Sequence, residues 1–354
     1  MKTRIMSHRK KIMFAGAAAT GGAVYAYESH VQECPITGRS RFVALYPEQM
    51  KKISREEFEG LLEEYKSDIV TSDSEVYDRV VRVANRLLSG NKDIRQIYDK
   101  TWTVTLVDQP VQNAFVLPHG NIFVFRGMME LCDNDDQLAV ILGHEMAHAI
   151  LGHVAEKLTM ANFIQLIILV PMAVLWAVIP SDGIALVTDW FFDKVIEICF
   201  NLPFSRELEL EADVVGLTLA AKACFDVREA PAFWKRMEFY EEIEAPGSND
   251  KDLEFLFTHP VHSTRYETLS TQMSQALQLR LDCGCSNLDP RCDPQIRIRE
   301  MEKVREEILR EKSEHNDRVV NGEGYVNIVK NPMEDKQQIY SQNPVTSQST
   351  ITKS

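Results

Sequence analysis

The sequence predicts an α+β fold in which a small sheet packs beside two helices that carry histidine and carboxylate side chains. Residues 138–151 form an apolar run long enough for a buried helix, and this run holds two histidines four residues apart. Residues 101–126 contain the β-branched and aromatic runs and the turn residues of short strands. Residues 205–220 combine four carboxylates with apolar positions at helical spacing. Together, the three stretches supply the sheet and the two helices.

Length and composition fit one folded domain with terminal appendages. The chain has 354 residues, of which 45% are hydrophobic, enough for a sizeable core. Its 52 Asp and Glu residues exceed its 39 Lys and Arg residues, giving a net charge of −13. We therefore expect no nucleic-acid partner, because phosphate binding needs a basic face and none is apparent. Seven scattered cysteines, an odd number, do not fit a small disulfide scaffold.

The first 34 residues predict a basic leader followed by a membrane anchor. Several Lys and Arg residues precede Ile12–Tyr27, which is apolar and uncharged. This run is short for a spanning helix, which needs about 20 residues. A secretory signal peptide with a loose cleavage site at Ala17–Ala19 is the alternative. No acidic residue occurs before Glu28, which also fits an import signal.

Two scaffold helices and a sheet are expected next. Ser54 and Glu57 form a capping box for a helix over 54–69, and a second apolar stripe over 76–87 is closed by Gly90. Strands are then predicted over three ranges: Trp102–Val107, Phe115–Leu117 and Ile122–Phe125. From the residues alone, the last two strands form an ordinary hairpin.

The apolar run at 138–151 contains the motif His144-Glu145-x-x-His148. Residues four apart lie on one face of a helix, so both imidazoles can bind one Zn²⁺. Glu145 lies beside them, where its carboxylate can accept a proton from water. The alternative is a pair of partly buried structural histidines. His153 is offset by five residues and would be turned away from this face, so we expect a surface or capping role for it.

A third metal ligand is needed, and its position defines the class. A metzincin would place Gly and His at the positions of Leu151 and Val154, so that class is excluded. The stretch Ser205–Asp213 offers four carboxylates instead, of which Glu209 and Asp213 lie four residues apart. Glu209 could complete a His₂Glu set, and Asp213 could hold a ligand imidazole. We expect a solvated face for the other two, Glu207 and Glu211, although spacing alone does not choose among the four.

The paired motifs His-Glu-x-x-His and Ser-Arg-x-x-Glu-x-x-Ala-Asp resemble the gluzincin peptidases of the HtpX and CAAX-prenyl-protease type. The resemblance extends over 35–285 and is strongest to the mitochondrial inner-membrane peptidases whose activity overlaps that of the m-AAA protease. Three segments carry this closer resemblance: Pro35–Phe42, Asn113–Pro118 and Ala220–Cys224. It implies a gluzincin-type domain in which an edge strand packs on the zinc-binding helix and a second helix carries the Glu ligand.

The resemblance also assigns roles to residues. It places the third zinc ligand at Glu209 and the carboxylate that supports a ligand at Asp213. Asn113 and Ala114 resemble the edge strand on which an extended substrate adds as one more strand. The motif Thr258-His259-Pro260 is similar to a later family motif, and His259 is a candidate donor to the oxyanion. Arg265 could supplement His259 or anchor a carboxylate of the site.

The function implied by the resemblance is stress-responsive endopeptidase activity with one Zn²⁺ per chain at the mitochondrial inner membrane. Implied partners are membrane lipid and membrane-tethered substrates such as the dynamin-like fusion GTPase. A homo-oligomer is left open. The alternatives are a general quality-control or prenyl-protein peptidase of another membrane, and an inactive relative that only binds partners. The many spanning helices that a prenyl-protein peptidase needs are not found in this sequence.

The remaining chain predicts a membrane-associated insert and a tail. An apolar insert near 161–200 includes Phe163–Ile179, which could span the membrane, lie on it, or form a core helix kinked at Pro171. A helix over 270–281 precedes three cysteines, which could form a disulfide or bind a metal: Cys283, Cys285 and Cys292. We expect the domain to extend over 35–310 and a polar, disordered tail over 311–354.

Overall fold

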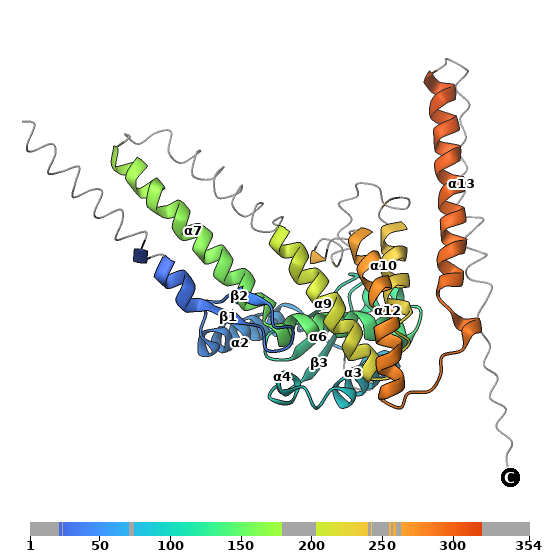
Figure 1. Ribbon diagram of the computed structural model, residues 1–354, viewed down its shortest axis with the longest axis horizontal. Helices are drawn as coiled ribbons and strands as arrows, with labels where there is room; N and C mark the ends of the chain where they lie inside the picture. The colour runs from blue at the N-terminus through green and yellow to red at the C-terminus, as the bar shows by residue number, and fades with distance from the viewer. Residues whose placement is uncertain are drawn as a thin grey trace, which may run out of the picture. The chain divides into compact units, whose positions relative to one another are not determined.

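The computed structural model describes residues 21–22, 24–70, 74–178, 203–239, 242, 255, 258–259 and 263–320 (Figure 1). Three strands form the central sheet: β3 (Thr103–Val107), β4 (Ala114–Val116) and β5 (Asn121–Phe125). Their order is β3-β5-β4, with β3 parallel and β4 antiparallel to β5. β4 is therefore an edge strand, as the predicted fold requires.

The two faces of the sheet are buried by different elements, because alternate side chains of a strand point to opposite faces. On one face, Phe123 and Phe125 pack against the apolar stripe of α2 (Pro47–Glu64). On the other, Ile122 and Val124 belong to the main core, to which α3 (Glu75–Gly90) contributes. The predicted amphipathic helices thus cover the sheet.

The start of α2 corrects the predicted capping box. The helix begins at Pro47, whose fixed φ suits a first helical position. The Gln49 side chain accepts a hydrogen bond from the Tyr46 N–H at 2.8 Å and caps the first turn. Ser54 is buried inside the helix instead of opening it. In contrast, α3 ends at Gly90 as predicted.

A hairpin that the sequence did not predict precedes α2. It consists of β1 (Val31–Glu33) and β2 (Ser40–Phe42), paired antiparallel. The connection contains Gly38, whose φ of 72° lies in the left-handed region that favours glycine. The residue before β2 is Arg39, which reaches into the domain.

The helical part of the domain carries the metal-binding motif. α6 (Asp135–Leu151) is capped by Asn134, whose Oδ1 accepts from the Gln137 N–H at 2.8 Å. It ends at Gly152, where φ is 75°. Further helices are α4 (Arg95–Tyr98), α5 (Arg126–Leu131), α7 (His153–Val178), α9 (Pro203–Lys222), α10 (Glu229–Phe239), α12 (Ser263–Asp282) and α13 (Gln295–Val320).

The expected apolar insert begins within α7, which runs from His153 to Val178 as one helix. In the part of the chain that the structure describes, no single helix has the length and apolarity of a membrane span. Taken together, α6 and residues 153–165 have the length and composition of a membrane span, but the two helices are bent by 57° relative to each other. Residues 1–20 of the expected leader and anchor and 179–200 of the insert lie outside the described residues.

Of the three cysteines near the end of α12, one forms a disulfide, with a partner outside the group, and no metal-binding group includes them among the described residues. Cys285 is bonded to Cys224, which follows α9, whereas Cys283 and Cys292 are free and exposed. The bond joins residues 61 positions apart and ties the end of α12 to the end of α9. Further on, α13 continues past residue 311, where the sequence predicted a tail, and residues 321–354 lie outside the described residues.

Candidate metal centre

Two glycines bring α6 and α9 into close contact. A Cβ atom on Gly216 would lie 2.8 Å from the His144 backbone nitrogen, and one on Gly143 would lie 3.0 Å from the Gly216 carbonyl oxygen. Only glycine allows this separation of the two backbones. The crossing places the carboxylates of α9 beside the histidines of α6.

Four buried side chains meet at this crossing: His144 and His148 of α6, Glu209 of α9, and His259. His144 Nε2 lies 3.1 Å from His148 Nε2, 3.2 Å from Glu209 Oε2 and 3.2 Å from His259 Nδ1. Ligands bound about 2.0 to 2.1 Å from a tetrahedral ion lie about 3.3 Å from one another. These separations therefore match a single shared cation.

The chemistry of the group also fits zinc. Imidazole nitrogens and a carboxylate form a donor set that Zn²⁺ accepts, and a catalytic site uses three such ligands and leaves the fourth position for water. Glu209 Oε1 is buried and accepts no hydrogen bond from the residues that the structure describes. Buried carboxylate oxygens are costly without a partner, and a cation would supply one. The group is suited to one zinc ion.

Asp213 lies beside His144, where the resemblance placed a supporting carboxylate. Asp213 Oδ1 lies 2.9 Å from His144 Nδ1. Arg265 donates to both oxygens of Asp213, from Nε at 2.7 Å and from Nη2 at 2.6 Å. Burial raises the pKa of Asp213, but Arg265 and His144 outweigh it, so this pKa is lowered. Arg265 thus anchors a carboxylate of the site, one of its two expected roles.

Trp234 of α10 completes the support of Arg265. The guanidinium carbon lies 3.4 Å from the centre of the Trp234 ring, a cation–π contact that replaces part of the lost hydration. Both side chains are fully buried. Trp234 could not be predicted from its local sequence, because α10 carries no motif and reaches the site only through packing.

Glu145 and His259 face each other beside the ligand group. His259 Nε2 lies 3.2 Å from Glu145 Oε1, and His259 Nδ1 lies 2.8 Å from Glu209 Oε2. One ring nitrogen of His259 is thus among the ligand atoms and the other is at the expected base. Burial raises the pKa of the Glu145 carboxyl, which suits a group that must accept and return a proton near neutral pH.

The expected substrate-binding residues lie at the start of the edge strand. Asn113 and Ala114 are both buried, and the Asn113 carbonyl accepts from the Phe125 N–H at 3.0 Å. The neighbouring Gln112 carbonyl accepts from the Phe255 N–H at 3.1 Å. The His259 N–H in turn donates to the Phe255 carbonyl at 2.8 Å, which connects His259 to this edge. Pro260 lies outside the described residues.

Two predictions about charged neighbours were wrong. His153 was expected in a surface or capping role and Glu211 on a solvated face, but their side chains are only 1% and 8% exposed. Helical spacing fails for His153 because α6 ends at Gly152 and the chain bends by 57°. The bend returns His153 to His148, with the two Nδ1 atoms 2.7 Å apart. Gly152 was a signal for this break, since glycine commonly ends a helix. Glu207 is exposed, as expected.

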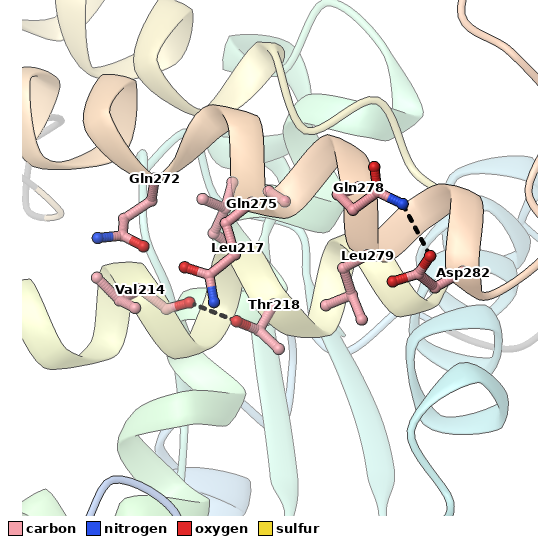
Figure 2. A pocket seen from close by; sticks show the side chains of 9 residues that line it. Val214, Leu217, Thr218, Gln272, Gln275, Gln278, Leu279 and Asp282 are labelled. Atoms are coloured by element: carbon pink, nitrogen blue, oxygen red, sulfur yellow. Dashed lines mark hydrogen bonds between the residues drawn. The ribbon is translucent and has the colours of Figure 1, made fainter.

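A separate groove lies between α9 and α12, on a different part of α9 from the ligand group (Figure 2). Its polar side chains are partly satisfied locally: Thr218 donates to the Val214 carbonyl at 2.9 Å, and Gln278 donates to Asp282 at 2.9 Å. No metal ligand lines it, so it is not part of the candidate site. The lining residues are Val214, Leu217, Thr218, Gln272, Gln275, Ala276, Gln278, Leu279 and Asp282.

Sequence comparisons agree with this geometry. Residues 77–273 match the model of peptidase family M48. The mitochondrial metalloendopeptidase OMA1 of Homo sapiens is 41% identical over 295 residues, which cover 82% of this chain and 56% of the relative. The corresponding protein of Danio rerio is 38% identical, covering 90% of this chain and 67% of the relative. That of Schizosaccharomyces pombe is 32% identical, covering 76% and 74%.

The fold and the buried ligands define a gluzincin-type domain suited to one zinc ion. The chain belongs to peptidase family M48, because the family model covers more than half of it and relatives match over most of its length. The chain spans about half the length of the two mammalian relatives, 56% and 54%.

Proposed function

We propose that the chain is a zinc metalloendopeptidase. The observation that carries this proposal is the juxtaposition of a buried His144, His148 and Glu209 group with the carboxylate of Glu145. A metal site that serves only structure does not need a carboxylate base beside its ligands. The family membership and the names of the relatives support the same conclusion.

In this proposal each residue has a distinct role. His144, His148 and Glu209 hold the metal, and Asp213 orients His144. When bound, Zn²⁺ supplies Lewis-acid polarisation and lowers the pKa of a water ligand towards about 7. Glu145 accepts the proton of the attacking water and donates it to the leaving amine.

Substrate binding is proposed at the edge strand β4. An extended peptide can pair with an exposed strand edge through backbone hydrogen bonds. We propose Asn113 and Ala114 as the residues of this edge that bind substrate; both are buried, so a substrate strand would have to displace what covers them. This mode selects for unfolded or extended segments of protein substrates.

The test of the catalytic proposal compares the wild type with Glu145→Gln. Zinc content and peptide cleavage are measured on the same preparations. The amide cannot accept the proton, so cleavage should fall by at least about 10² to 10⁴ while zinc is retained. Glu207→Gln, an exposed carboxylate of α9, is the control and should leave both unchanged. Wild-type cleavage by Glu145→Gln would refute the mechanism.

His259 is proposed as a donor to the oxyanion that forms during hydrolysis. Its Nε2 lies at the base and its imidazole touches the ligand group, so it can reach the reacting carbonyl. Removing one such donor costs about 10² to 10³ in turnover. His259→Ala should therefore lose turnover and keep zinc. Loss of zinc would instead make His259 a ligand, and unchanged turnover would exclude both roles.

The cellular setting is proposed to be the mitochondrial inner membrane. The relatives are named as mitochondrial, and we propose stress-responsive quality control there, with membrane lipid and membrane-tethered substrates such as the dynamin-like fusion GTPase as partners. Residues 1–34 would anchor the peptidase domain at 35–310, with the apolar insert near 161–200 as a second contact and 311–354 as a tail. Alkaline extraction of membranes tests the anchor. If a chain lacking residues 1–30 is freely soluble and active, the apolar insert does not bind the membrane.

A further inference from the structure

A continuous chain of polar side chains leads from the proposed zinc ligand His148 to the N-terminal hairpin. His148 Nδ1 lies 2.7 Å from His153 Nδ1, and His153 Nε2 lies 3.1 Å from Glu211 Oε2. Arg39 Nε donates to the same Glu211 oxygen at 2.7 Å. Three segments far apart in the sequence, on α7, on α9 and before β2, therefore meet behind one ligand.

The protons of this chain can be assigned from the metal outward. His148 Nε2 faces the other ligand atoms, so it must be unprotonated to bind a metal. Its proton then resides on Nδ1, which donates to His153 Nδ1. His153 consequently carries its own proton on Nε2, which donates to the Glu211 carboxylate. Every donor in this arrangement meets an acceptor, with both imidazoles neutral.

The far end of the chain is fixed by Arg39. Its Nη1 and Nη2 donate to the two oxygens of Glu156 at 2.8 and 2.7 Å, while its Nε holds Glu211. Thr37 donates to the second oxygen of Glu211. One guanidinium thus clamps two carboxylates, of which Glu156 is only 1% exposed. A bidentate contact of this kind fixes orientation as well as charge.

We propose that His153, Glu211 and Arg39 are positioning residues of the metal centre, which hold the tautomer and ring orientation of His148. This inference rests on the proposed function, since it presumes that His148 binds zinc. The two histidines of α6 would then have equivalent supports. His144 contacts a carboxylate directly through Asp213, whereas His148 reaches one through His153. The hairpin that contains Thr37 and Arg39 becomes part of the zinc centre.

A purely structural role would not need this arrangement. An ion pair between Arg39 and Glu211 could attach the hairpin to α9 without an imidazole between Glu211 and the ligand. Carboxylates and other groups that support metal-bound histidines typically contribute 10- to 100-fold to metal affinity. That difference in affinity separates the two roles.

The experiment measures zinc affinity of the full chain by competition with a chelator. His153→Leu removes the acceptor for His148 and should weaken zinc binding by about 10- to 100-fold. Glu211→Gln should weaken it in the same direction. Glu207→Gln, one helical turn before Glu211 and exposed, is the matched control and should bind zinc as the wild type does.

The conservative variant His153→Gln provides the rescue. A glutamine side chain can accept from His148 through its oxygen and donate to Glu211 through its nitrogen. It should recover most of the lost affinity, and the absorption spectrum of the Co²⁺-substituted protein should return towards that of the wild type. Urea unfolding of the metal-free variants is measured in parallel, so that a loss of fold is separated from a loss of ligand support.

The outcomes are distinct. Weaker zinc binding by His153→Leu, with recovery by His153→Gln, supports the inference. Wild-type affinity in His153→Leu and Glu211→Gln overturns it, as does a loss that only follows the stability of the metal-free fold. If wild-type protein binds zinc and cleaves peptide, such a result leaves the proposed function intact. Failure of the wild type to bind zinc would reject the proposed function itself.

Discussion

Gly216→Ala should separate the two ligand-bearing helices and weaken the zinc site without unfolding the domain. The added Cβ would lie 2.8 Å from the His144 nitrogen and 2.9 Å from the Gly143 carbonyl carbon. These are backbone atoms, so no side-chain rotation relieves the contact. To reach an ordinary contact of about 3.4 Å, α9 must move away from α6 by about 0.6 Å.

The magnitude follows from this shift. Overpacking a core costs about 1 to 3 kcal/mol, and the higher helix propensity of alanine returns about 1 kcal/mol. Because the contact is with backbone, we expect a net loss of about 2 kcal/mol in the free energy of unfolding. Metal–ligand distances tolerate about 0.2 Å. A movement of about 0.6 Å at Glu209 should therefore weaken zinc binding at least about tenfold.

Urea unfolding of the metal-free protein and chelator competition for zinc measure the two effects. The control is Gly60→Ala, an exposed helical glycine in α2 whose added Cβ would meet nothing within 4 Å. It should be neutral or gain up to about 1 kcal/mol, with zinc affinity unchanged. If Gly216→Ala matches the control in both measurements, the close approach of α6 and α9 is not what positions the ligands.

Three further predictions concern the ligand, the disulfide and pH. Glu209→Ala should lose zinc, whereas Glu207→Ala should not, and equal zinc content by metal analysis would place the third ligand elsewhere. Replacing Cys224 and Cys285 by alanine should lower the free energy of unfolding by about 4 kcal/mol, from the chain entropy of a 61-residue loop. The free energy of unfolding of this variant should equal that of the reduced wild type. In the metal-free protein, burial lowers the pKa of His144, but Asp213 and Glu209 raise it to about 9. The His144 imidazolium should therefore stabilise the metal-free protein below about pH 6.5, and this stabilisation should be lost as pH rises through about 9. Zinc affinity should instead increase over the same range, because protons compete with the metal for His144. If metal-free stability and zinc affinity changed with pH in the same direction, the raised pKa of His144 would be contradicted.

The local part of the site could be predicted from the sequence because helix periodicity determines it. His144 and His148 are four residues apart within a single helix, so their shared face needs no tertiary information. The choice of Glu209 among four carboxylates did need such information. Which side of α9 faces α6 depends on the contact at Gly216, a residue that the spacing argument did not include. The resemblance to a family supplied what periodicity could not.

The rest of the site depends on contacts between distant segments. Trp234 lies in no motif, and Arg39 lies in a segment, Pro35–Phe42, to which the resemblance assigned no role; both reach the centre through packing of elements that are separate in sequence. The position of His153 was predicted wrongly because α6 does not continue to residue 153: the helix ends at Gly152, and the spacing of one helix does not apply beyond it. The partner of Cys285 was missed for a similar reason, since Cys224 is 61 residues away and only the fold brings the two together.

The charges of the site explain why its distant supports matter. The site holds three buried carboxylates, Glu145, Glu209 and Asp213; among the described residues here the one fully buried permanent cation is Arg265, which contacts Glu209 and Asp213. Lys157 is partly exposed, and its Nζ lies 3.6 Å from Glu209 Oε1, too far for a hydrogen bond. Metal binding requires neutral histidines, and in that state this set carries an excess of negative charge, which is costly in a buried environment and which a divalent cation would neutralise. The ligand group is therefore held together against its own repulsion by the glycine contact of α6 with α9, by Arg265 on Asp213, and by the His153–Glu211–Arg39 chain behind His148. A change in any of these contacts is expected to alter metal affinity before it alters the fold.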